Sequence, residues 1–161
     1  MKGTTEALCD TENHSGQPFN NRQKFHTMQT NEQHLPLTPR ENELGRIVID
    51  VAFKLHKTLG PGLLESVYEK CFCYELGSRG IWFERQKPAP IIYEGLEIDD
   101  GLKLDLLVDD LLIVELKAQE NYHPVWEAQL LSYLKLTNKR IGYIINFHVP
   151  LMKNGFKRMV L

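Results

Sequence analysis

The chain has 161 residues, a hydrophobic fraction of 42% and a formal net charge of −2, which is enough sequence for one folded domain with its own core. No stretch approaches the roughly 18 consecutive apolar residues of a membrane-spanning helix, and the N-terminus lacks the apolar centre of a secretory signal. Three cysteines cannot form a closed set of disulfides, which favours a reducing compartment. We therefore expect a cytoplasmic protein that is not bound to a membrane.

The charge is unevenly distributed along the chain. Residues 39–127 carry ten Lys and Arg against seventeen Asp and Glu, whereas residues 128–161 carry six basic residues and no acid. An acidic region that could bind metal is thus followed by a basic region that could bind phosphate. The simpler alternative is that the basic residues only solvate a surface, and charge alone favours this alternative.

Residues 1–38 are rich in Thr, Asn, Gln and His and contain only nine apolar residues. Such a segment cannot offset the entropy of ordering by burying surface, so we expect a disordered polar tail. The folded domain is then expected to span residues 39–161. It begins with a capping box at residues 38–41, in which Pro39 takes the first helical position.

The periodicity of apolar residues predicts three helices and six strands. The first helix begins at Pro39 and ends at Gly60-Pro61-Gly62, the second spans about residues 63–78, and the third spans about 124–137. The strands are expected at 81–86, 89–94, 102–108, 111–117, 140–147 and 156–161. This order predicts an α/β fold, with a mixed β-sheet flanked by helices.

The candidate site is centred on Asp105 and the segment Glu115-Leu116-Lys117. Glu115 and Lys117 are two residues apart on a predicted strand, so both side chains project from one face. A hard cation such as Mg²⁺ prefers carboxylate and carbonyl oxygens, which Asp105, Glu115 and the Leu116 backbone carbonyl could supply. Lys117 would orient an attacking water or offset the charge that builds on a phosphate.

An Asp followed ten residues later by Glu-x-Lys also occurs by chance, usually as surface charges of a hairpin. Three features favour a site instead. Glu115 and Lys117 stand within an apolar run, where charges are costly unless they pair or bind a ligand. Glu65 lies in the first turn of the second helix, where the helix dipole favours its anionic form. Gln129 and Tyr133 share one face of the third helix and could steady a water or a phosphate.

The segment Gly62-Leu-Leu-Glu65-Ser-Val-Tyr68 resembles the signature of the GxxExxY protein family. The resemblance runs from about residue 40 to the C-terminus and includes the segments 59–69, 105–108, 113–118 and 127–133. This family looks like a branch of the PD-(D/E)XK nuclease superfamily. The resemblance implies a restriction-endonuclease-like αβββαβ core, here preceded by an N-terminal helix, and metal-dependent phosphodiester hydrolysis by in-line attack of water.

The resemblance also implies roles for six residues. Glu65 matches the acid of the first core helix, Asp105 the acid of the second strand, and Glu115 and Lys117 the E-x-K pair. Gln129 and Tyr133 match the Q-x-x-x-Y motif of the recombination-exonuclease branch. The expected ligands of Mg²⁺ or Mn²⁺ are Asp105, Glu115, the Leu116 carbonyl and, through water, Glu65.

Two positions depart from the pattern of the superfamily. Trp126 stands where a polar residue, often His, is expected, and it could narrow the site or stack on a base. Leu104 replaces the proline that commonly precedes the first Asp.

The expected function is metal-dependent hydrolysis of phosphodiester bonds, in DNA rather than RNA. The alternative is a catalytically silent nucleic-acid-binding module of a repair or defence assembly, and a third is a structural protein with a relic site, which retention of all six residues disfavours. The basic residues Lys135, Lys139 and Arg140 are expected to contact the phosphate backbone of the nucleic acid.

The strand register makes a geometric prediction. A two-residue turn at Asp109-Asp110 would pair Asp105 with Val114 and leave Asp105 and Glu115 on opposite faces of the sheet. A connection of three residues pairs Val108 with Leu112, and therefore Asp105 with Glu115. The apolar alternation favours the second register, with Leu104, Leu106 and Val108 on the opposite face from Asp105. We expect the face with Asp105, Glu115 and Lys117 to lie under the second helix and Glu65.

Overall fold

The computed structural model of the protein describes residues 35–161, and the first 34 residues, with most of the expected tail and Cys9, lie outside this description. The elements in chain order are α1 (Pro39–Leu59), α2 (Glu65–Ser78), β1 (Phe83–Tyr93), β2 (Leu96–Val108), β3 (Leu112–Lys117), α3 (Val125–Leu136), β4 (Ile141–Asn146), the 3₁₀ turn η1 (Met152–Asn154) and β5 (Phe156–Val160). After the initial helix, the order is αβββαβ followed by one further strand, β5, which confirms the expected fold class.

Helix α1 begins at the expected capping box. The Thr38 side chain accepts the Glu41 backbone N–H, and the Glu41 carboxylate accepts the Thr38 backbone N–H at 2.7 Å. The folded unit starts before this cap, because Leu37 packs against the core and the Arg140 guanidinium donates to the Leu35 carbonyl. The last four residues of the expected tail therefore belong to the folded unit.

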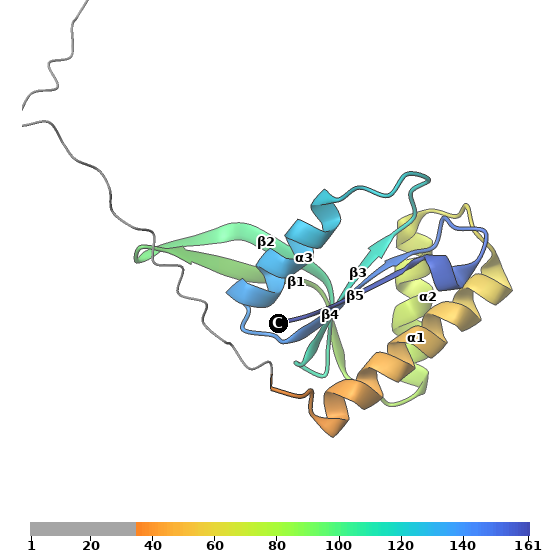
Figure 1. Ribbon diagram of the computed structural model, residues 1–161, viewed down its shortest axis with the longest axis horizontal. Coiled ribbons are helices and arrows are strands. Elements are labelled where there is room, and N and C mark those ends of the chain that lie inside the picture. Colours follow the sequence, from red (N-terminus) through yellow and green to blue (C-terminus); the bar gives the residue numbers. More distant parts are fainter. Residues whose placement is uncertain (1–34) are drawn as a thin grey trace, which may run out of the picture. The chain divides into compact units, whose positions relative to one another are not determined.

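A five-stranded mixed sheet in the order β1-β2-β3-β4-β5 forms the centre of this unit. Strands β3 and β4 are parallel and joined by α3, and the other neighbours are antiparallel. Helices α1 and α2 pack on one face of the sheet through the larger core cluster, and α3 packs on the other face through a smaller one (Figure 1). Within the described residues, no helix is both long and apolar enough to cross a membrane.

The expected break at Pro88 is wrong, because β1 runs through it as a single strand and the sheet has five strands rather than six. Pro88 lies opposite Lys103 in the β1–β2 ladder. Because β1 is an edge strand, a residue whose missing N–H faces away from β2 costs no ladder hydrogen bond.

The β2–β3 hairpin has the predicted register, with Val108 opposite Leu112. Asp109 and Asp110 in the three-residue connection have φ angles of 53° and 52°, a left-handed conformation that Asp tolerates better than most residues. One detail of the prediction is wrong, because Leu104 packs in the α3 cluster rather than with Leu106. The β2–β3 ladder ends at Leu106, so the alternation of faces is interrupted beyond this point.

Candidate functional site

The structure brings Asp105, Glu115 and Lys117 together. The Lys117 Nζ lies 3.6 Å from Asp105 Oδ2 and 3.3 Å from Glu115 Oε2. All three side chains are largely buried, and the Glu115 residue is only 2% exposed. One ammonium group is thus held between two carboxylates inside the protein.

These carboxylates occupy a fork between β2 and β3. The last backbone pair of the ladder is Leu106 opposite Val114. Beyond it, the Leu116 N–H donates to Asp105 Oδ2 at 3.0 Å, and the Asp105 N–H donates to Glu115 Oε1 at 3.4 Å. Because the N–H and C=O of a strand residue point to the same side, the Leu116 carbonyl is also directed toward β2 and Asp105.

The expectation that this face lies under α2 is wrong. Leu116 and Val114 pack with the α2 core, whereas Ile113, which shares the face of Glu115, packs with α3. Glu65 instead reaches the site from the first turn of α2, and the charges of Lys117 and Asp105 both act on its carboxyl group.

The segment from Gly62 to Tyr68 holds Glu65 in place. Gly62 has a φ of 97°, which favours glycine. The fully buried Tyr68 ring stacks on Phe147 with centroids 4.2 Å apart, and its hydroxyl donates to the Gly60 carbonyl at 2.6 Å and accepts the Leu63 N–H at 3.3 Å. Tyr68 therefore fixes the turn from which Glu65 extends.

Helix α3 brings Gln129 and Tyr133 toward the same cluster. The Gln129 amide donates to the Tyr133 hydroxyl, and burial, with the charges of Glu115 and Asp105, raises the pKa of Tyr133. The helix lies close to β4 at Gly142, where an added Cβ would come within 2.7 Å of Leu130. Trp126, on the same helix, is buried edge-to-face against Tyr122 and is not open to a base.

Burial dominates the electrostatics of the site. Burial, reinforced by the charge of Asp105, raises the pKa of Glu115 from 4.5 to about 7. The pKa of Glu65 is also raised, because the effect of burial outweighs the charge of Lys117 and the hydrogen bond of the Ala118 backbone, which both act to lower it. For Lys117 burial lowers the pKa, but the three neighbouring carboxylates outweigh it and the net shift is upward.

The donor set suits a hard divalent cation. Three carboxylates share one ammonium group, so with all four groups charged the cluster retains negative charge. Asp105, Glu115 and the Leu116 carbonyl supply oxygen ligands of the kind that Mg²⁺ and Mn²⁺ prefer. Among the residues whose side chains the structure describes, no three His, Cys, Asp or Glu side chains are gathered closely enough to form a metal cluster by themselves.

Sequence reasoning missed two residues at the site. The Gln86 amide donates to Asp105 Oδ1 at 3.3 Å across β1 and β2. Asn146 lies beside Lys117 in the β3–β4 ladder, accepts the N–H groups of Gln119 and His148, and donates to the Gln119 carbonyl. A polar residue at the end of an otherwise apolar strand is the signal that indicates Asn146.

The structure does not bring Lys139 and Arg140, two of the three expected nucleic-acid-binding residues, to this site. Lys139 and Arg140 precede β4, at the opposite end of that strand from Asn146, which is roughly 20 Å from Arg140 at 3.3 Å per residue. Lys139 pairs with Asp110 at 2.9 Å, and Arg140 lies 3.8 Å from Glu41. Lys135 lies in the last turn of α3, two residues after Tyr133.

The αβββαβ fold, with a buried Asp, Glu and Lys on adjacent strands, is typical of a class of metal-dependent nucleases. Comparison of the sequence with known families identifies the same class. The profile of the PD-(D/E)XK nuclease superfamily matches residues 42–159, and the chain belongs to this superfamily. Comparisons with curated proteins and with solved structures give no match.

Proposed function

We propose that this chain is a cytoplasmic nuclease of the GxxExxY branch, which hydrolyses phosphodiester bonds in DNA with Mg²⁺ or Mn²⁺. The observation that carries the proposal is the Lys117 ammonium held between the Asp105 and Glu115 carboxylates on a strand that is otherwise apolar. Isolated buried charges are costly, and membership of the nuclease superfamily gives this cluster a chemical purpose.

The proposed ligands of the cation are Asp105, Glu115 and the Leu116 carbonyl, with Glu65 acting through water. When bound, the divalent cation would polarise the phosphate and stabilise the negative charge that develops on it. Lys117 Nζ has three protons, so it can donate to a phosphate oxygen or orient the attacking water while remaining paired with a carboxylate.

The helix α3 residues complete the proposed site. The Tyr133 hydroxyl accepts the Gln129 amide proton, which leaves its own proton free to donate to a phosphate oxygen. Gln86 and Asn146 are positioning residues, since they contact Asp105 and the chain beyond Lys117.

The test is incubation of the purified full chain with supercoiled plasmid, linear duplex, single-stranded DNA and RNA of matched sequence, in Mg²⁺, Mn²⁺ or chelator. We expect cleavage of DNA that chelator abolishes. Binding of nucleic acid without cleavage under any metal condition would favour the alternative of a silent binding module. Faster cleavage of RNA than of DNA would overturn the substrate assignment alone.

A further inference from the structure

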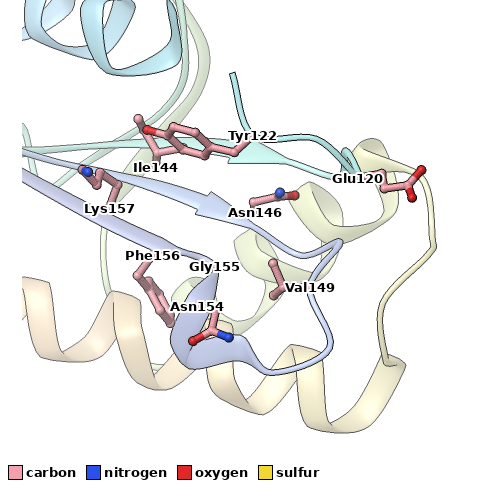
Figure 2. A pocket seen from close by; sticks show the side chains of 9 residues that line it. All are labelled: Glu120, Tyr122, Ile144, Asn146, Val149, Asn154, Gly155, Phe156 and Lys157. Carbon is pink, nitrogen blue, oxygen red and sulfur yellow. The ribbon is translucent and has the colours of Figure 1, made fainter. Parts of the chain in front are cut away.

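A pocket of about 310 Å³ lies where β4 ends and β5 begins, next to the chain that follows β3 (Figure 2). Its floor is formed by β4 and the start of β5, on the face that carries Ile144 and Asn146. Its rim includes the chain that follows β3 and the turn η1. Nothing in the proposed cleavage chemistry requires this space, so the pocket needs its own explanation.

The strand register fixes how the pocket lies relative to the site. In the parallel β3–β4 ladder, Glu115 is beside Ile144 and Lys117 is beside Asn146. Neighbouring residues in a ladder point to the same face, and neighbouring strands are about 4.8 Å apart. Because Ile144 and Asn146 both line the pocket, it begins one strand away from the residues proposed to act on the scissile phosphate.

The lining combines one aromatic ring with polar groups at the rim. Tyr122 contributes an exposed aromatic ring, and Asn154 and Lys157 contribute hydrogen-bonding groups. Ile144 is only 1% exposed, and the Phe156 ring packs against Phe53 of α1 on the opposite face of the sheet, so neither adds a stacking surface. The Tyr122 ring is held in place, because its hydroxyl donates to Glu127, which also pairs with Lys157 at 3.1 Å. Tyr122 nevertheless remains 47% exposed. Such a lining suits a planar ring whose edge carries donors and acceptors.

We propose that this pocket binds one unpaired nucleobase, from a nucleotide next to the scissile phosphate, and that the substrate is therefore single-stranded or frayed DNA. The inference rests on the proposed function, whose substrate class it narrows. A base inside a duplex is paired and stacked on both sides, so it can enter only after it leaves the stack. An unpaired base enters without that cost, while its phosphate reaches Lys117.

The first measurement is equilibrium binding, by fluorescence anisotropy in chelator, of a labelled single-stranded oligonucleotide of about 12 nucleotides and of the same sequence as a blunt duplex. Chelator suppresses cleavage, so binding is read alone. We expect tighter binding of the single strand, and equal or tighter binding of the duplex would overturn the proposal.

The second measurement uses Asn154→Trp, which fills the pocket from an exposed position and leaves the core untouched. The matched control is Lys153→Trp, which adds the same ring at the exposed neighbouring position in the same turn. We expect Asn154→Trp to weaken single-strand binding about tenfold, the size expected from the loss of one base–aromatic stack, and Lys153→Trp to bind as wild type does. Equal affinity of the two variants would overturn the proposal.

Two substitutions of Tyr122 keep the proposal testable if Asn154→Trp fails to fold. Tyr122→Leu removes the ring, and Tyr122→Phe keeps the ring but loses the bond to Glu127. We expect weaker single-strand binding only for Tyr122→Leu. Failure of the nuclease proposal can be told apart from failure of the pocket proposal. A wild-type protein that cuts no substrate refutes nuclease activity, and the binding comparison still decides whether the pocket holds a base.

Discussion

The side chain of Asp105 takes the place of a backbone partner for Leu116, whose N–H donates to Asp105 Oδ2 at 3.0 Å. The contact occurs where the β2–β3 ladder stops, so it both ends the pairing of the two strands and orients a carboxylate toward Lys117. The hydrogen bond from the Asp105 N–H to Glu115 is its counterpart in the other direction. The two acids are therefore part of the backbone hydrogen bonding of the sheet.

Replacement of either acid by its amide should abolish metal-dependent cleavage and leave the fold intact. Asp105→Asn and Glu115→Gln each remove a negatively charged ligand while preserving volume and an oxygen that can accept the same backbone N–H. Initial rates of plasmid cleavage at several Mg²⁺ concentrations check this, with circular dichroism as the control for folding. A folded variant that cuts at the wild-type rate would place the metal elsewhere.

The stability of the metal-free protein should fall as the pH rises from about 4.5 to 7. The pKa of Glu115 is 4.5 when exposed and about 7 when buried, so between these pH values the folded chain binds more protons than the unfolded chain. Its free energy of unfolding then decreases with pH and levels off above about 7. Urea denaturation in chelator at several pH values measures this.

Glu115→Gln is the control for that prediction, because the amide does not titrate. The variant should lose the decrease between pH 4.5 and 7, and Mg²⁺ should raise the melting temperature of the wild type more at pH 8 than at pH 6. A wild-type stability that rises through this window, or a variant with the same profile, would contradict the assigned pKa of Glu115.

Two truncations should differ in stability. Removal of residues 1–34, which are poor in apolar residues, should leave the melting temperature nearly unchanged. Removal of residues 1–38 also deletes the Thr38 cap and the Leu37 packing, and should cost at least about 1 kcal/mol, the typical value of an N-cap. Thermal unfolding of the two shortened proteins side by side checks this, and equal melting temperatures would contradict the role of the capping box.

The triple replacement of Lys135, Lys139 and Arg140 by Gln separates two roles for these residues. If they contact the phosphate backbone, DNA binding weakens and its salt dependence flattens. Because Lys139 and Arg140 lie beside acids at the far end of β4, we expect an unchanged salt slope and a lower melting temperature. A flatter salt slope would instead support direct contacts between these basic residues and the phosphate backbone, as the charge distribution along the chain indicates.

Local signals in the sequence predicted most of the fold. The capping box and the apolar spacing located α1 because a helix start depends on a few neighbouring residues. The β2–β3 register was predictable because a slip of one residue would have moved the apolar residues to the wrong face. Pro88 misled the prediction because its cost depends on whether the strand is at an edge, which is a property of the whole sheet.

The site was predictable as far as its residues share strands or motifs. Asp105, Glu115 and Lys117 meet because two adjacent strands carry them. Gln86 could not be assigned in advance, since its contact with Asp105 depends on which strands become neighbours, whereas Asn146 had a signal in its place at the end of an apolar strand. The same long-range topology places Lys139 and Arg140 at the other end of the sheet, although they follow Tyr133 closely in the sequence.

The most direct test of the central claim is the rate of DNA cleavage by wild-type protein and by Lys117→Ala, purified in parallel and measured in Mg²⁺ and in chelator. Lys117 lies between both carboxylates and has no structural contact outside the cluster among its described ion pairs. We expect Mg²⁺-dependent cleavage by the wild type and at least a hundredfold lower rate for the folded variant, the size typical for loss of one charge-stabilising group. Equal rates for the two proteins in Mg²⁺ would contradict this claim.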